Sequence, residues 1–134
     1  MPAEPMLTAN QKLVLDALKE ADTPLSAYGL LERLTGDGIR APLQVYRALD
    51  KLILLGFVHR LESLNAFVVC SHREQCHHRP AAFAICTQCG RVAEFLETAV
   101  DRGLARWSKG HAFRAERVTV EMRGVCGSCA EAVS

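Results

Sequence analysis

The chain has 134 residues, of which 49% are hydrophobic and 23% charged, and its net charge is +1. This composition excludes a disordered or fibrous chain and predicts one globular domain or two small ones. The opening residues lack the basic start and apolar run of a signal peptide, and no later stretch approaches the roughly 18 apolar residues of a membrane helix. We therefore expect a cytoplasmic protein without a membrane partner.

Charge and cysteine content narrow the classes of function further. A nearly neutral total charge does not indicate a nucleic-acid partner, so such a function has to rest on local arrangement. Six cysteines in a chain without a signal sequence predict reduced thiols. Paired cysteines in that setting are more often metal ligands or catalytic thiols than disulfides.

Three helical segments are predicted in the first 56 residues. Thr8 and Gln11 have the form of a capping box, and Ser26 is a second N-cap candidate. A third segment has Pro42 in its first turn and Gly56 just past its end. After each predicted helix start, apolar residues recur at helical spacing: Val14, Leu18 and Ala21; Leu30, Leu31 and Leu34; Val45, Leu49, Leu52 and Leu55.

A hairpin is predicted after the helices. The segment FVHRLESLNAFVVC, residues 57–70, contains two β-rich runs separated by a polar turn. Three helices followed by a hairpin predict a winged helix-turn-helix, in which the third helix is the recognition helix and the hairpin the wing. The segment SHREQCHHRP, residues 71–80, has no apolar periodicity and is expected to be a linker.

The second half predicts a small α+β unit. AAFAI and RVAEF have the composition of strands and flank a cysteine turn. Leu96, Val100, Leu104 and Trp107 form a helical stripe that Gly110 closes. RVTVEMR then alternates as a strand does, before GVCGSC near the end of the chain.

Two C-x-x-C pairs stand out in this unit. Cys86 and Cys89 form the first pair, and Cys126 and Cys129 the second, each in an expected turn with a glycine nearby. Two such pairs let four thiolates converge on one zinc ion, and four protein ligands leave no open position, so the site is predicted to be structural. A thiol-redox pair is the alternative, but the first pair lies between two strands and does not open a helix.

A second constellation is spread over the wing, the linker and the second half. One by one, these residues have ordinary explanations as surface or core positions. Together they offer a thiolate, imidazoles and a carboxylate, which suit a mixed tetrahedral zinc site at the hinge. The candidate ligands are His59, Cys70, His72, Cys76, His77, His78 and Glu94.

Over nearly its whole length the chain resembles the ferric uptake regulator family, and within it most closely the zinc uptake regulator branch. The residues that carry the resemblance are LTANQKLVL, SAYGLL, VYRALDKLILLGFVHRLES, ICTQCGRVAEF and GVCGSC. The resemblance implies a dimeric, metal-activated repressor with three parts. These are a winged-helix DNA-binding domain at 1–69, a hinge at 70–80 and a dimerisation and zinc-binding domain at 81–134.

The resemblance also implies two zinc ions per chain. Structural zinc would fall on the four paired cysteines, and sensory zinc on His59, Cys70, His78 and Glu94. The linker does not align cleanly, so His77 and, less favoured, His72 stay open as alternatives to His78. A thiolate ligand favours zinc over iron or manganese. The alternatives are a family member that senses iron, manganese or nickel, and a thiol-based redox switch.

DNA contacts are expected from the third helix. Gln44, Arg47 and Lys51 share one face of it, and Tyr46 lies beside them. Relatives commonly have threonine where Gln44 stands. A dimer implies a palindromic operator, and the resemblance implies promoters of zinc-uptake genes. The sequence has no arrangement typical of an enzyme active site, so neither catalysis nor a small-molecule substrate is expected.

Overall fold

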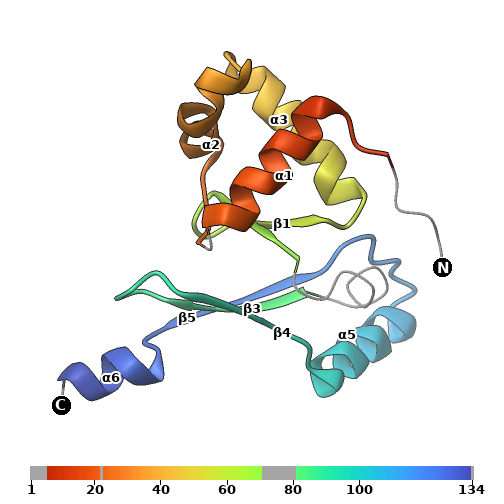
Figure 1. Cartoon of the computed structure of the whole chain (residues 1–134). Helices are drawn as coiled ribbons and strands as arrows, with labels where there is room; N and C mark the ends of the chain where they lie inside the picture. Colours follow the sequence, from red (N-terminus) through yellow and green to blue (C-terminus); the bar gives the residue numbers. More distant parts are fainter. Residues whose placement is uncertain (1–5, 22, 71–80, 134) are drawn as a thin grey trace. The chain divides into compact units, whose positions relative to one another are not determined.

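The structure, a computed structural model, describes residues 6–21, 23–70 and 81–133 of the chain (Figure 1). The chain divides into two compact units, residues 1–73 and 74–134. The expected linker, with its candidate ligands His72, Cys76, His77 and His78, lies outside the described residues. Within the described ranges, no helix combines the length and the apolar character that crossing a membrane requires.

The first unit begins with three helices, α1 (Ala9–Ala21), α2 (Ala27–Leu34) and α3 (Pro42–Leu54), with a short 3-10 helix, η1 (Thr35–Asp37), after α2. The predicted capping box is confirmed: Thr8 N donates to Gln11 Oε1 at 3.0 Å, and Gln11 N donates to Thr8 Oγ1 at 3.2 Å. Ser26 caps α2 by accepting from Gly29 N at 3.0 Å. These caps satisfy backbone N–H groups that have no partner inside a helix.

The helices enclose one hydrophobic core together with residues of the hairpin. The predicted apolar stripes supply half of the core residues. Of the other stripe residues, Ala21 and Leu31 are only half-buried, and Leu55 lies just past the end of α3. The core consists of Val14, Leu15, Ala17, Leu18, Ala27, Leu30, Leu34, Ile39, Val45, Ala48, Leu49, Leu52, Val58 and Phe67.

The predicted hairpin is confirmed as β1 (Val58–Leu61) and β2 (Ala66–Val69), which pair antiparallel. A short bridge between Leu25 and Phe67 ties the segment before α2 to β2. At the polar turn, Asn65 has φ +48°, and its Oδ1 accepts from Arg60 Nη2 at 3.1 Å. The three helices and this hairpin form the winged helix-turn-helix that the sequence predicts.

The second unit contains a three-stranded sheet. β3 (Ala81–Cys86) lies between β4 (Val92–Phe95) and β5 (Thr119–Gly124), antiparallel to the first and parallel to the second (Figure 1). The central strand β3 is buried along almost its whole length. The expected strands of this unit are thus confirmed, and the mixed sheet makes the fold class α+β.

Helices α5 (Thr98–Gly110) and α6 (Gly127–Val133) complete the second unit. The expected helical stripe differs at its start, because Leu96 precedes α5 and Glu97 caps the helix by accepting from Ala99 N at 3.3 Å. The second cysteine pair also differs from the expected turn: Cys126 directly precedes α6, and Cys129 lies in its first turn. Helical backbone at this pair therefore presents N–H groups close to its sulfur atoms.

Candidate metal centre and nucleic-acid interface

The first cysteine pair is shaped by the turn between β3 and β4. Cys86 ends β3, and its carbonyl accepts from Gly90 N at 3.0 Å, which closes the turn around Cys89. Gly90 has φ +77°, a left-handed conformation that favours glycine over residues with a side chain. The C-x-x-C-G sequence therefore brings the chain back on itself and turns both sulfur atoms toward one centre.

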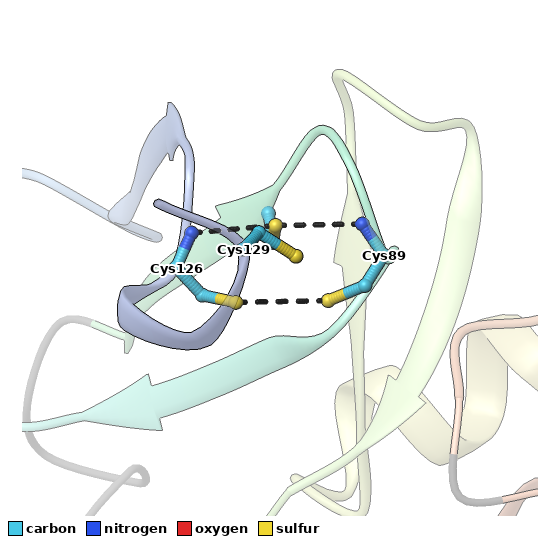
Figure 2. A group of neighbouring side chains, drawn as sticks. Cys89, Cys126 and Cys129 are labelled. Atoms are coloured by element: carbon cyan, nitrogen blue, oxygen red, sulfur yellow. Dashed lines mark hydrogen bonds between the residues drawn. The ribbon is translucent and has the colours of Figure 1, made fainter. Parts of the chain in front are cut away.

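The second pair reaches the same centre because β5 runs parallel to β3. Cys86 is the register partner of Gly124, so the chain beyond β5 emerges beside the first turn. Thr87 fixes this junction, since both its backbone N, at 2.7 Å, and its Oγ1, at 3.1 Å, donate to Gly124 O. Figure 2 shows Cys89, Cys126 and Cys129 gathered at this point. Nothing in the sequence analysis had singled out Thr87.

The four sulfur atoms lie within 4.8 Å of one another, and all four residues carry thiols in place of disulfides. We call Cys86, Cys89, Cys126 and Cys129 the four-cysteine cluster. Four sulfurs at about 2.3 Å from a tetrahedral zinc would be about 3.8 Å apart. Cys89 Sγ and Cys126 Sγ are separated by 3.8 Å, so the cluster fits a tetrahedral four-thiolate zinc site.

Backbone N–H groups prepare this cluster for a cation. Three of them donate to Cys86 Sγ, from Cys126 at 3.3 Å and from Gln88 and Cys89 at 3.4 Å. These donors lower the pKa of the Cys86 thiol to about 6, and the N–H of Cys126 has the largest effect. Backbone donation from Cys129 likewise lowers the pKa of Cys126. The N–H groups thus stabilise thiolates, the form that binds metal.

Cys129 behaves in the opposite way when no cation is present. Its thiol donates toward neighbouring sulfur, chiefly Cys126, and this raises the pKa of Cys129 to about 12. Without a cation the cluster therefore combines thiolates with a retained proton, because like charges this close disfavour full ionisation. A divalent cation would displace that proton, so zinc binding would be coupled to proton release.

Two of the expected sensory residues, His59 and Cys70, lie in the first unit. His59 belongs to β1 and is paired with Val68, while Cys70 follows β2 and donates its backbone N–H to Phe57 O at 2.9 Å. This register makes His59 and Cys70 diagonal neighbours on one face of the hairpin. A ring nitrogen of His59 and Cys70 Sγ lie within 4.8 Å of each other, and Cys70 is buried.

The other two expected sensory residues lie elsewhere in the chain. Glu94 is half-buried on β4 of the second unit, where it is the register partner of Phe83. His78 lies outside the described residues. The hairpin thus presents an imidazole and a thiol side by side, a soft pair suited to zinc, while the carboxylate belongs to the other unit.

The expected DNA-contacting residues lie on α3. Tyr46, Arg47 and Lys51 are exposed and Gln44 is half-buried, whereas Val45 on the opposite side is buried. The structure gives Gln44 a further role at the helix start: its Oε1 accepts from Arg40 N at 2.8 Å and from Ala41 N at 3.1 Å. A threonine-to-glutamine exchange therefore does not leave this helix without a cap. The signal was visible in the sequence, since glutamine at the third helical position is half of a capping box.

Comparisons with known proteins agree with this arrangement. A family model described as the ferric uptake regulator family matches residues 6–123. The zinc uptake regulation protein of Escherichia coli strain K12 is 36% identical over 126 residues, which cover 93% of this chain and 73% of that protein.

Two solved structures are similar over most of their length. A zinc uptake regulator complexed with zinc and DNA is 34% identical, with a TM-score of 0.87 over 96% of this chain and 85% of that one. The crystal structure of holo XcZur is 36% identical, with a TM-score of 0.85 over 96% of this chain and 89% of that one. Together with the winged helix and the four-cysteine cluster, these matches show that the chain belongs to the ferric uptake regulator family.

Proposed function

We propose that this protein is a zinc-responsive transcriptional repressor that binds a palindromic operator as a homodimer and controls zinc-uptake genes. The similarity to a zinc uptake regulator complexed with zinc and DNA carries this proposal. The four-cysteine cluster and the winged helix supply matching chemistry, one a metal site and the other a DNA-binding fold. Membership in a family of transcriptional regulators favours a regulatory role over an enzymatic one.

Each chain would hold two zinc ions with different tasks. The four-cysteine cluster would hold the structural ion, which has no open coordination position. His59, Cys70, His78 and Glu94, which we call the sensory set, would hold the regulatory ion. The adjacent imidazole and thiol of the hairpin support this assignment, because a thiolate ligand favours zinc over iron or manganese.

A homodimer is supported by apolar side chains on the second unit. Large hydrophobic residues are exposed along α5, after it and on β5. Such a concentration of apolar surface is typical of an interaction site. The exposed residues are Val100, Leu104, Trp107, Phe113 and Met122. A two-fold symmetric dimer would present two recognition helices to two half-sites, which is why the operator is expected to be palindromic.

DNA contacts would come from α3. Arg47 is exposed and can pair with a guanine edge through two hydrogen bonds, and Lys51 can contact a phosphate. Tyr46, which is 39% exposed, can contact a thymine methyl group or a phosphate. Gln44 shares this face and is the fourth expected contact.

Regulation would be a shift of population among conformations. The sensory set draws its ligands from both units and from the segment between them, so binding of one ion by all four would favour a single arrangement of the winged helices. A coupling of about 1 to 3 kcal/mol is typical of such linkage, and about 5.5 kcal/mol is needed to change the ratio of two states from 1:99 to 99:1.

Selection from a random pool of DNA duplexes tests the proposal. With zinc present, the protein should enrich a palindromic sequence, and the enriched duplex should lose affinity when a chelator removes exchangeable zinc. Titration with iron, manganese and nickel should restore binding less well than zinc. Enrichment that is equal with and without metal would contradict the repressor mechanism, and a preference for another metal would change the signal but keep the DNA-binding function.

A further inference from the structure

The amide of Gln44 has a fixed orientation at the start of α3. Two backbone N–H groups, from Arg40 at 2.8 Å and from Ala41 at 3.1 Å, donate to its Oε1. Only the oxygen end of an amide can accept these hydrogen bonds, because the NH2 end is a donor. The Nε2 end must therefore face away from these two groups. Among the residues that the structure describes, none accepts a hydrogen bond from Gln44 Nε2.

The position of Gln44 on α3 makes this orientation relevant to DNA. Gln44 lies in the first turn of the recognition helix, three residues before the exposed Arg47 and on the same face. The N-terminal residues of a recognition helix are those that contact base edges in the major groove. The amide nitrogen of Gln44 is thus available where base pairs are read.

A glutamine fixed in this way cannot use the usual recognition of adenine. That mode needs the amide oxygen to accept from adenine N6 while the amide nitrogen donates to N7. The oxygen of Gln44 already accepts from two backbone groups of the helix start. Only donation remains, and it suits guanine O6 and N7 best, then thymine O4 or adenine N7, whereas cytosine presents a competing donor at N4.

Building on the proposed function, we infer that Gln44 is a specificity-determining residue that donates from Nε2 to a base acceptor, preferentially guanine, and disfavours cytosine at one position of each half-site. The backbone N–H groups of Arg40 and Ala41 hold the amide in this orientation. One side chain thus both caps the recognition helix and reads a base.

Gln44→Glu separates these two roles. A glutamate at the third helical position still offers an oxygen to the backbone N–H groups, and a negative charge in the first turn suits the helix dipole. The second carboxylate oxygen, however, is an acceptor and matches cytosine N4 in place of guanine. The variant should therefore keep the helix start and reverse the base preference.

The chain offers a matched control in Gln11. This residue occupies the same third position of α1, and its Oε1 accepts from Thr8 N at 3.0 Å. Gln11→Glu makes the same chemical change to the same kind of cap on a helix that is not the recognition helix. Comparing the two variants removes any general effect of a new negative charge on DNA affinity.

The experiment measures zinc-dependent affinity of wild type, Gln44→Glu and Gln11→Glu for a panel of operators. The starting duplex is the sequence that wild type enriches, and each position of one half-site is replaced by the other three base pairs, symmetrically in both halves. Wild type should prefer guanine over cytosine by about tenfold at one position, and Gln44→Glu should reverse that order there only. Gln11→Glu should keep the wild-type order.

Different failures have different meanings. If Gln44→Glu weakens binding equally for every duplex, Gln44 contacts the phosphate backbone and the inference is overturned. Strict selection of adenine over guanine at the affected position would overturn it as well, because that requires a free amide oxygen. If wild type enriches no sequence with zinc, the proposed function fails and takes this inference with it. Circular dichroism of both variants checks that α3 and α1 are retained.

Discussion

The four-cysteine cluster and the proposed sensory set would both bind zinc, but their ligands come from different parts of the chain. The cluster is local: all four sulfurs lie within one unit, at the ends of two neighbouring strands, and backbone N–H groups stabilise the thiolates. The proposed sensory set would instead draw His59 and Cys70 from the first unit and a carboxylate on β4 from the second. A local site acts on the folding of one unit, whereas a site assembled from separate parts can act on their arrangement.

The largest effect is expected from Cys126→Ser. This change removes one sulfur of the cluster and also alters the residue that directly precedes α6. Because the free energy of structural zinc binding, about 10 kcal/mol or more, is also folding free energy in a small unit, we expect the second unit to unfold and the dimer to dissociate. Zinc content, near-UV circular dichroism and sedimentation would measure this. A folded dimer that still holds both ions would contradict the structural role of the cluster.

Mild chelation should distinguish the two sites without any mutation, because it should remove zinc from only one of them. Zinc per chain, measured by elemental analysis on protein purified under reducing conditions, should fall from two to one. The remaining ion should stay with the four-cysteine cluster, because four thiolates bind zinc without an exchangeable position. The dimer should persist while zinc-dependent DNA binding is lost. If each chain holds one ion throughout, even after zinc is added, the result would agree with the four-cysteine cluster as a zinc site and contradict the sensory set.

Cys70→Ser should affect only the sensory set. Cys70 is buried at the end of the hairpin, and serine preserves its size while removing the thiolate. We expect zinc affinity at this set to fall by more than about 100-fold, since even residues that only orient metal ligands are worth 10- to 100-fold. Fluorescence anisotropy with operator DNA across a zinc titration would measure the shift. The variant should remain a folded dimer with its cluster filled, and a normal response to zinc would contradict the assignment.

The elements and the cysteine cluster could be predicted because their signals are short-range. The capping box of Thr8 and Gln11, the cap at Ser26 and the C-x-x-C pairs each depend on residues within four positions of one another. The convergence of the two pairs could also be predicted, because double pairs at this spacing have few uses other than zinc. The resemblance to a family then predicted a DNA-binding domain followed by a dimerisation domain.

Features that depend on long-range register could not be predicted in the same way. The junction of Thr87 with Gly124 exists because β5 lies parallel to β3, and no local pattern encodes that pairing. The helix at the second cysteine pair was not predicted, because glycine and serine in GVCGSC are typical of a turn. The diagonal placement of His59 and Cys70 likewise follows from hairpin register, and sequence spacing alone does not predict it.

The smallest effect is expected from Glu94→Gln. Glu94 is the one expected sensory ligand on the sheet of the second unit, and an amide oxygen keeps its shape while removing the charge that stabilises a bound cation. We expect zinc affinity at the sensory set to fall by about tenfold, less than for Cys70→Ser, because the thiolate and the imidazoles remain. The same anisotropy titration would resolve the two shifts.

The sheet provides a matched control for this change. Glu94 on β4 and Glu121 on β5 are both register partners of Phe83, so they flank β3 at the same level and on the same face. Glu121→Gln makes the same chemical change on the opposite side of β3 and should leave the zinc response unaltered. If both variants shift the response equally, the effect is one of general charge on this face, and Glu94 is not a ligand. A shift confined to Glu94→Gln would place the fourth ligand of the sensory set on β4 and make that set the link between the two units.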